Sequence, residues 1–274
     1  MNAVKAVESA CSRFDPDSEL VRLLHQPVGT AVTVGPILFQ SLQFACEVAK
    51  WTDGRFDPTI GSRMEELGFH RHYLTGDSVH WQTDVPRSTT FRDIELDPHN
   101  QTVRLHRPVR LDLGAVAKGL AVDLAVKELS AYDFTGFVVD AGGDLYAAGA
   151  DSTGQAWTIG IRHPVERETS IRTLKGQNIA VCTSGTYERR SPLDSQSHHI
   201  LNAHSQRSAQ GFFSMTAVGP FAMMTDAFST AAFLYPVDEA LALLEAVGLD
   251  GMLITEDLDI RATPGMEGYL NEPV

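Results

Sequence analysis

The sequence predicts an α+β fold in which mixed sheets are flanked by helices. Some segments place apolar residues three and four positions apart, which is typical of helices, while others alternate apolar and polar residues, which is typical of strands. The two kinds of segment intermix without the regular strand–helix–strand order that a doubly wound parallel sheet requires. With 274 residues, 43% of them hydrophobic, the chain is long enough to bury a large core.

Helices are expected where apolar residues recur on one face. Residues 35–52 have this spacing, with Leu38 and Leu42 among the apolar positions, and the turn-forming pair Asp53-Gly54 ends the segment. Further helices are expected at residues 115–131, 224–234 and 237–247.

Strands are expected between these helices. Residues 92–113 alternate around the turn sequence DPHN and predict a hairpin, and residues 136–149 predict two strands joined by a glycine turn. Further strands are expected at residues 156–162, 177–183, 214–219 and 251–255. The composition marks no domain boundary.

Charge and cysteine usage restrict the class of protein. The formal net charge is −13, and no basic stripe is visible, which argues against a nucleic-acid partner. Cys11, Cys46 and Cys182 are sparse and odd in number, so reduced thiols are expected. The chain as given shows neither the apolar core of a signal peptide nor an apolar run of membrane-spanning length, so a cytoplasmic protein without a membrane partner is expected.

The junction between a predicted strand and helix is the first candidate for chemistry. It has the sequence LDLGAVAKG, with Gly114 at the junction and Lys118 in the helix. The N–H groups at a helix start attract phosphate, and a lysine adds positive charge. The alternative is a glycine turn followed by a core helix with one surface lysine.

Two short polar segments are further candidates. Gly142 and Gly143, followed by Asp144, allow a ligand to approach the backbone closely, although a tight hairpin turn by itself explains the glycines better. Asp226 and Thr230 are four residues apart on a predicted helix and share a face. Their oxygen atoms suit Mg²⁺, whereas helix capping is the alternative explanation.

Adjacent histidines, His198 and His199, are a weaker candidate for proton transfer. Histidine exchanges a proton near neutral pH, but neighbouring residues on a strand point to opposite faces. At most one of the two side chains is therefore expected to serve a given site.

Taken in order, these segments resemble the ApbE family of FAD:protein FMN transferases. LDLGAVAKGLAVD is similar to the family's D-L-G-G-I-A-K-G-x-A-V-D, and VVDAGGDLYAAG to N-A-G-G-D-x-x-x-x-G. AVCTSGTYER, SHHILN and MTDAFSTAAF resemble A-x-A-T-S-G-x-Y, H-H-I-x-D and L-A-D-A-L-S-T-A-L. Upstream, SRFDPDSEL and TDGRFDPTIG resemble S-x-Y-x-P-x-S-E-L and T-x-G-A-F-D-P-T-V-G.

The resemblance implies one compact ApbE-like domain over residues 1–274 with FAD in a cleft. It implies Mg²⁺-dependent transfer of FMN from FAD to a threonine or serine hydroxyl of an acceptor flavoprotein, with release of AMP. The backbone carbonyl of Ala115 and the side chains of Asp226 and Thr230 would hold the metal. His199 or Asp144 would take the proton of the hydroxyl. The FAD site would be lined by Gly114, Ala115, Lys118, Gly142, Gly143, Asp144, Ser184 and Gly185.

Some positions depart from the family pattern. Leu24 stands where the family often has Asn, and residues 203–206 lack its Pro, Thr and Gly. The chain is also expected to start inside the family's first helix, without the strand that precedes it. A Mg²⁺-dependent FAD pyrophosphatase, which uses water as nucleophile, and a non-catalytic FAD-binding protein therefore stay open as alternatives.

Overall fold

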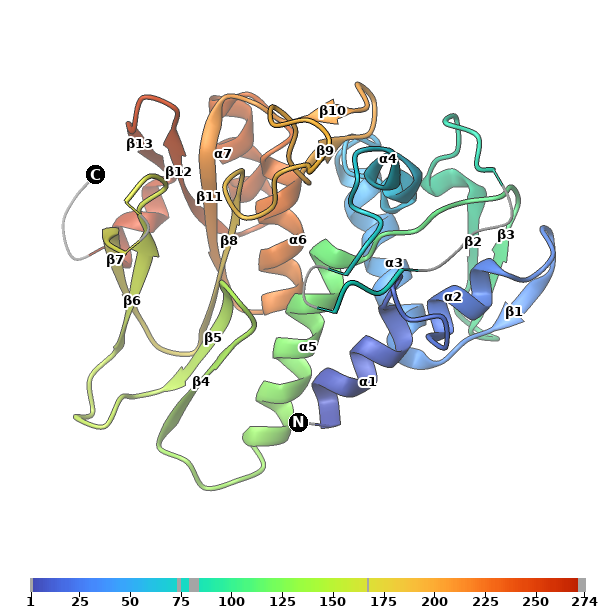
Figure 1. Ribbon diagram of the computed structural model, residues 1–274. Coiled ribbons are helices and arrows are strands. Elements are labelled where there is room, and N and C mark those ends of the chain that lie inside the picture. Colours follow the sequence, from blue (N-terminus) through green and yellow to red (C-terminus); the bar gives the residue numbers. More distant parts are fainter. Residues whose placement is uncertain (1, 73–74, 79–83, 167, 271–274) are drawn as a thin grey trace. The chain divides into compact units, whose positions relative to one another are not determined.

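The computed structural model shows two compact units (Figure 1). It describes residues 2–72, 75–78, 84–166 and 168–270. The first unit comprises Met1–Ala117 and Arg189–Ser208, and the second comprises Lys118–Glu188 and Ala209–Val274.

Helices α1, α2 and α3 and a small antiparallel sheet form most of the first unit. The helices span Asn2–Cys11, Glu19–Leu24 and Pro36–Trp51, and α1 packs on both of the others. The sheet has the order β1-β3-β2, from Ala31–Thr33, Thr102–Leu105 and Ile94–Asp97. The unit also contains α4, β9, β10 and two 3₁₀ turns, at Gly61–Glu66, Leu201–Asn202, Arg207–Ser208, Pro58–Ile60 and Phe91–Asp93.

Local sequence explains where these helices begin. Ser18 caps α2, because its hydroxyl accepts a hydrogen bond from the N–H of Val21 at 3.1 Å. Pro36 opens α3, where its missing N–H costs nothing. Leu38 and Leu42 are fully buried on one face of α3, as the apolar spacing predicts.

The predicted hairpin is confirmed in its first part and wrong in its second. Strands β2 and β3 pair around the DPHN turn, but β3 ends at Leu105. Residues 106–113 form no strand, since Pro108 lacks the N–H that a ladder needs. The apolar residues of this segment alternate because Leu111 and Leu113 are buried in the core. Between them, the backbone N–H of Asp112 donates a hydrogen bond to the carbonyl of Pro58.

A six-stranded antiparallel sheet is the centre of the second unit. Its order is β13-β12-β11-β8-β5-β4. In that order the strands span Ile260–Ala262, Asp250–Thr255, Phe212–Gly219, Ile179–Gly185, Asp144–Gly149 and Gly136–Asp140. Helix α5 (Gly114–Leu129) starts in the first unit and continues here, followed later in the chain by α6 (Ala222–Ala232) and α7 (Val237–Ala246).

Both faces of this sheet are covered. Strand β8 shows the alternation: Ile179 and Val181 join a core with the β6–β7 hairpin and the 3₁₀ turn Pro264–Gly268, whereas Ala180 and Cys182 pack against α5 and α6. Strands β6 and β7 span Trp157–Arg162 and Ser170–Gly176. Figure 1 shows the helices on one side of the sheet and the hairpin on the other.

The α+β class is thereby confirmed. The predicted helices correspond to α3, α5, α6 and α7, and the predicted strands to β4, β5, β6, β8, β11 and β12, with small shifts at their ends. Apolar periodicity did not reveal the short elements α2, α4, β1 and β13, which carry too few residues for a clear period. It also did not reveal β7, although that strand has seven residues.

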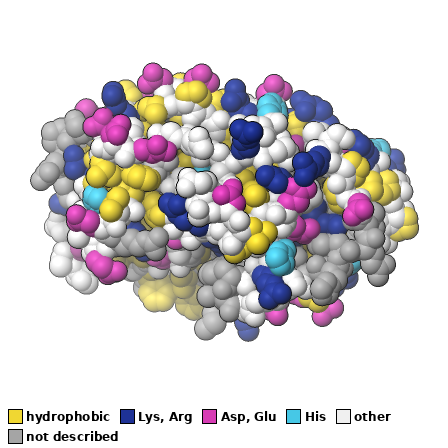
Figure 2. Space-filling model, turned by 45° about the horizontal axis from the view of Figure 1, so that its top comes forward, with side chains coloured by type: hydrophobic (Ala, Val, Ile, Leu, Met, Phe, Trp, Pro, Cys, Tyr) yellow, Lys and Arg dark blue, Asp and Glu magenta, His cyan; other side chains and the backbone are white. Residues whose placement is uncertain are grey.

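The described helices lack a membrane-spanning segment, and the surface carries charges of both signs. In the described part of the chain, none of the helices combines the length and hydropathy that crossing a membrane requires. On the face drawn in Figure 2, Lys and Arg side chains are interspersed with Asp and Glu side chains.

Candidate functional site

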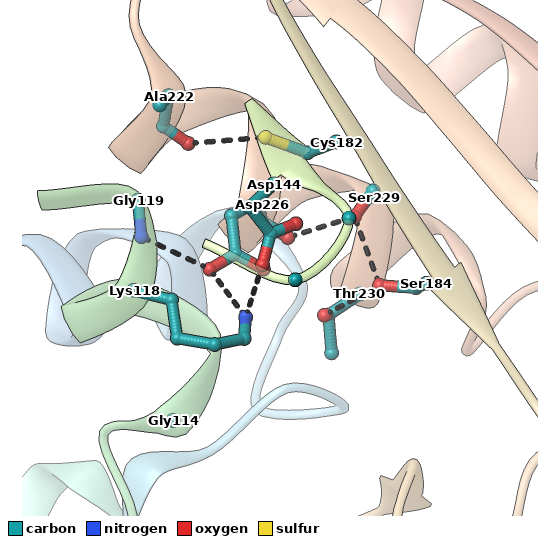
Figure 3. Close-up of polar contacts among 12 residues, drawn as sticks. Gly114, Lys118, Gly119, Asp144, Cys182, Ser184, Ala222, Asp226, Ser229 and Thr230 are labelled. Carbon is teal, nitrogen blue, oxygen red and sulfur yellow. Dashed lines mark hydrogen bonds and ion pairs between the residues drawn. The ribbon is translucent and has the colours of Figure 1, made fainter. Parts of the chain in front are cut away.

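Three charged residues from three elements of the second unit meet at one point (Figure 3). The Nζ atom of Lys118, on α5, lies 2.5 Å from Oδ2 of Asp144 and 2.9 Å from Oδ2 of Asp226. Asp144 begins β5 and Asp226 lies on α6. The side chains of the two aspartates are 4% and 3% exposed and that of the lysine is 43% exposed, so the end of a partly exposed lysine side chain meets two buried carboxylates.

Gly119 makes this meeting possible. A Cβ atom on Gly119 would lie 2.4 Å from the carbonyl oxygen of Ala222 and 2.5 Å from Cα of Met223. The missing side chain therefore lets α5 approach the backbone of α6. The N–H of Gly119 also donates a hydrogen bond to Oδ2 of Asp226 at 3.3 Å.

The charges at this point are unevenly balanced. Burial raises the pKa of the Asp226 carboxyl and the charge of Asp144 raises it further, against the opposing effects of Lys118 and the Gly119 N–H. Burial alone would lower the pKa of Lys118, but the two carboxylates outweigh it and raise the pKa. With both carboxylates ionised, the cluster carries one negative charge in excess, which a further cation would stabilise.

A hydroxyl cluster lies next to Asp226 on α6. The Ser184 hydroxyl on β8 is 2.9 Å from the hydroxyl oxygens of both Ser229 and Thr230. Ser229 donates in turn to the backbone carbonyl of Asp226 at 2.9 Å. Asp226 and Thr230 lie one helical turn apart on α6, as predicted.

The oxygen atoms present here fit Mg²⁺. This ion prefers carboxylate and hydroxyl oxygens and shares its site with substrate phosphates. Asp226 and Thr230 supply such oxygens beside the excess negative charge described above. Among the described residues, no three His, Cys, Asp or Glu side chains gather in the arrangement of a metal site.

The glycine turn is a hairpin turn whose N–H groups are occupied. Gly142 and Gly143 have φ angles of +78° and +101°, which favour glycine. Their N–H groups donate to Oδ1 of Asp140 at 2.8 and 3.0 Å. Among the described residues, no atom lies within 4 Å of a Cβ built at either position, so that side of the turn is open.

The start of α5 is likewise largely satisfied by the chain itself. The N–H of Gly114 donates to the Asp112 carboxylate at 2.8 Å. The N–H groups of Val116 and Ala117 donate to the carbonyl of Leu113 at 3.0 and 2.8 Å. A phosphate bound here would have to replace these bonds, and the predicted roles of Gly114 and Ala115 stay predictions.

His199 belongs to the first unit, whereas Asp144 belongs to the second. The backbone N–H of His199 donates to the carbonyl of Arg189 at 3.2 Å, and its Nδ1 lies 3.3 Å from the same oxygen. The assignment of His199 as a proton acceptor stays a prediction. His198 is more deeply buried, and its backbone N–H donates to the hydroxyl of Ser208 at 2.9 Å.

The segment that departs from the family pattern forms the β9–β10 hairpin turn. The side-chain oxygen of Asn202 accepts hydrogen bonds from the N–H groups of His204 and Ser205, at 2.9 and 3.2 Å. Gln206 has a φ of +57°, so the left-handed conformation is kept where the family pattern has Gly. A cavity of about 70 Å³ in the first unit is lined by this turn and by other residues, among them Asp57, Thr59, Arg87 and Arg92.

Sequence reasoning missed some residues of this site. Gly119 lies inside a helix, where glycine destabilises the helix by about 1 kcal/mol relative to alanine. A glycine kept at such a position indicates that another backbone packs closely against the helix there. Ser229 gave no signal of its own. A serine in an apolar helix commonly donates a hydrogen bond to a backbone carbonyl of the preceding turn, so its presence does not indicate a functional site. Asp123 lies in a quoted motif, but nothing local revealed that its carboxylate accepts hydrogen bonds from the N–H groups of Ala222 and Met223.

The sequence of this chain is similar to those of known proteins. Residues 1–253 match the model of the ApbE family. A protein of Rhodobacter capsulatus named FAD:protein FMN transferase is 31% identical over 251 residues, which cover 88% of this chain and 47% of that protein. A Treponema pallidum protein of the same name is 29% identical over 286 residues, covering 94% of this chain and 76% of that protein. This chain therefore spans about half the length of the first relative and three quarters of the second.

A solved structure shares the fold. The crystal structure of an ApbE protein of Thermotoga maritima superposes with a TM-score of 0.88 at 28% identity, covering 99% of this chain and 89% of that one. The architecture described above is thus an ApbE fold. Because the family model covers most of the sequence, the chain belongs to the ApbE family, and the resemblance found from its motifs is confirmed.

Proposed function

We propose that this chain transfers FMN from FAD to a threonine or serine hydroxyl of an acceptor flavoprotein, releases AMP, and depends on Mg²⁺. The observation that supports this most is the Lys118–Asp144–Asp226 cluster beside the hydroxyl of Thr230. These residues stand at the positions that the family motifs assign to metal and FAD binding. The names of the curated relatives agree with the proposed reaction.

Asp226 and Thr230, together with the carbonyl of Ala115, are the proposed ligands of Mg²⁺. When bound, the ion would neutralise charge on the phosphoryl group and on the departing AMP. The residues of this chain keep the site charged and aligned, because Gly119 and Lys118 both hold Oδ2 of Asp226. Ser229 fixes the backbone of α6 at the same residue.

The remaining site residues are proposed to bind FAD or to move the proton. Lys118 supplies positive charge for the pyrophosphate, and the open side of the glycine turn allows backbone to approach it. The acceptor hydroxyl must lose a proton before or during attack on the phosphorus. Asp144 and His199 are the proposed acceptors of that proton. The other proposed FAD contacts are Gly114, Ala115, Gly142, Gly143, Ser184 and Gly185.

Co-expression with a candidate acceptor protein tests the proposal. We expect mass spectrometry to find an FMN adduct on a threonine or serine of the acceptor, and the reaction with purified protein to release AMP in proportion. With purified components, no adduct should form when EDTA has removed the metal beforehand. The cytoplasmic location stays a prediction from the sequence.

The products also separate the alternatives. Release of AMP and FMN together without an adduct would indicate a pyrophosphatase, in which water replaces the acceptor hydroxyl. FAD retained without either product would indicate a binding protein. Leu24 and the altered turn at residues 203–206 are the features of this chain that favour these outcomes.

A further inference from the structure

Helix α6 is capped by a residue of another helix. Its N-cap residue, Phe221, makes no side-chain cap hydrogen bond. Instead the Asp123 carboxylate on α5 accepts from the first N–H groups of α6, with Oδ1 2.7 Å from the Ala222 nitrogen and Oδ2 2.9 Å from the Met223 nitrogen. A carboxylate at this end of a helix is also favoured by the helix dipole.

Asp123 and Gly119 hold α6 at two successive points. They are four residues apart and therefore share one face of α5. Asp123 bonds the start of α6, and the N–H of Gly119 bonds Asp226 one turn further along α6. The backbones of the two helices pack closely against each other at Gly119 and Ala222. These bonds fix both the position of α6 along its axis and its rotation about it.

We propose that Asp123 is a positioning residue that aligns Asp226 and Thr230 for the metal. Without its carboxylate, two of the N–H groups at the start of α6 lose their acceptor and turn toward water. The first turn of α6 then shifts or frays, and the Asp226 carboxylate and the Thr230 hydroxyl no longer keep a fixed spacing. This inference rests on the proposed function, because it concerns the affinity of the metal site proposed there.

Calorimetric titration with Mg²⁺ tests the role directly, with FAD-loaded protein and without an acceptor. For Asp123→Ala we expect the dissociation constant of Mg²⁺ to rise by about tenfold to a hundredfold, as when other outer residues of metal sites are removed. Asp123→Asn keeps one acceptor oxygen, so it should restore part of the affinity. The affinity for FAD in EDTA should change less than about twofold, because Asp123 is not among the proposed FAD contacts.

Asp151 provides a matched control. Its carboxylate, in the turn after β5, also accepts two backbone hydrogen bonds, from Thr153 at 2.8 Å and Gln155 at 2.9 Å. Asp151→Ala should lower the melting temperature without changing the affinity for Mg²⁺. Titrations are made well below the melting temperature of each variant, so that loss of folded protein does not imitate a loss of metal binding.

Different outcomes would overturn the role of Asp123 and the metal site itself. If Asp123→Ala binds Mg²⁺ as tightly as the unaltered protein, Asp123 serves stability alone and the inference is wrong. If Asp123→Ala does not fold, Asp123→Asn takes its place, and an unchanged affinity of that variant for Mg²⁺ would likewise show that the inference is wrong. If the unaltered FAD-loaded protein binds no Mg²⁺, the metal assignment under the proposed function is wrong and this inference falls with it.

Discussion

The ammonium group of Lys118 balances one of the two carboxylate charges that Asp144 and Asp226 bury in the second unit. Which member of this cluster is replaced therefore decides whether function or stability is lost. Removing one carboxylate leaves a balanced ion pair, whereas removing the lysine leaves two buried negative charges without a partner.

Asp226→Ala should abolish Mg²⁺-dependent release of AMP while the protein stays folded. The remaining Lys118–Asp144 pair is neutral, so the substitution leaves no unpaired buried charge. An AMP-release assay and a circular dichroism spectrum check both halves of this expectation. Normal AMP release by a folded variant would rule out Asp226 as a metal ligand.

Lys118→Met should destabilise the metal-free protein by about 3 kcal/mol at neutral pH, the typical cost of breaking a buried ion pair. The unpaired carboxyls would then have pKa values above those in the unfolded chain. Stability from such groups is present below the unfolded pKa and is lost as pH rises through the folded pKa. Urea unfolding should therefore show the defect shrinking toward pH 4. Lys127→Met, an exposed site on the same helix, is the control and should change stability by less than about 0.5 kcal/mol.

Among the elements, the contact between α5 and α6 leaves no room for a side chain at Gly119. A β-carbon at Gly119 would lie closer to the backbone of α6 than real Cβ atoms come. Backbone atoms cannot turn aside as a side chain does, so the helices themselves would have to separate. The same separation would move Lys118 away from Asp226.

Gly119→Ala should lower the free energy of unfolding by about 2 kcal/mol, a typical cost of overpacking, even though alanine is the better helix former. Gly268→Ala is the matched control, because among the described residues no atom lies within 4 Å of its built Cβ. Thermal unfolding of both variants checks this. Equal melting temperatures would show that α5 and α6 have room to separate at little cost.

The segment before α5 is held by an ion pair in the first unit. The Nε atom of Arg13 lies 2.7 Å from Oδ2 of Asp112. Burial alone would raise the pKa of the Asp112 carboxyl, but the charge of Arg13 and the hydrogen bond from the Gly114 N–H bring the pKa below its usual value. Asp112 is thus more acidic in the folded than in the unfolded chain.

Asp112→Asn should cost about 3 kcal/mol at neutral pH, because it leaves Arg13 buried without its counter-charge. A carboxyl whose folded pKa is lowered contributes stability above the unfolded pKa and loses it as pH falls through the folded pKa. The difference between variant and unaltered protein should accordingly be complete at pH 7 and begin to shrink only below about pH 4, as the pH falls toward the folded pKa. Denaturant titrations at pH 7, 5 and 3 measure this, and a difference independent of pH would exclude the ion pair as its source.

For the whole molecule, the three cysteines report on folding. Cys11 and Cys46 are buried in the first unit and Cys182 in the second, and all are free thiols. Burial raises the pKa of Cys11 to about 11 and that of Cys46 to about 12, and it raises the pKa of Cys182 as well. The reactive thiolate is therefore scarce at neutral pH.

None of these thiols should react with a thiol reagent within minutes at pH 7.5 while the protein is folded, and all of them should react in denaturant. Peptide mass spectrometry of the labelled cysteines along a urea titration would then follow the two units separately. Rapid labelling of Cys46 in the native protein would contradict the burial described here. The outcome also confirms or corrects the expectation of reduced thiols.

The sequence alone was sufficient for features that depend on neighbouring residues. Apolar spacing in residues 35–52 and 237–247 located α3 and α7 closely, because a helix buries the face that its own period creates. The spacing of Asp226 and Thr230 placed both on one face of α6. The ordered motifs identified the family. In residues 106–113 the apolar residues alternate as in a strand, but tertiary packing of an irregular segment causes the alternation, so the prediction of a strand was wrong.

Only the tertiary structure decided the partners of these residues. Lys118 was expected to face phosphate, yet it lies between two carboxylates, and Asp226 is 108 positions further along the chain. Asp123 meets the start of α6 across a similar separation. No local period carries such information, because these bonds form when the packing of α5 and α6 against the sheet brings distant backbone together. Sequence therefore indicated most residues and elements of the candidate site, and packing determined which of their atoms meet.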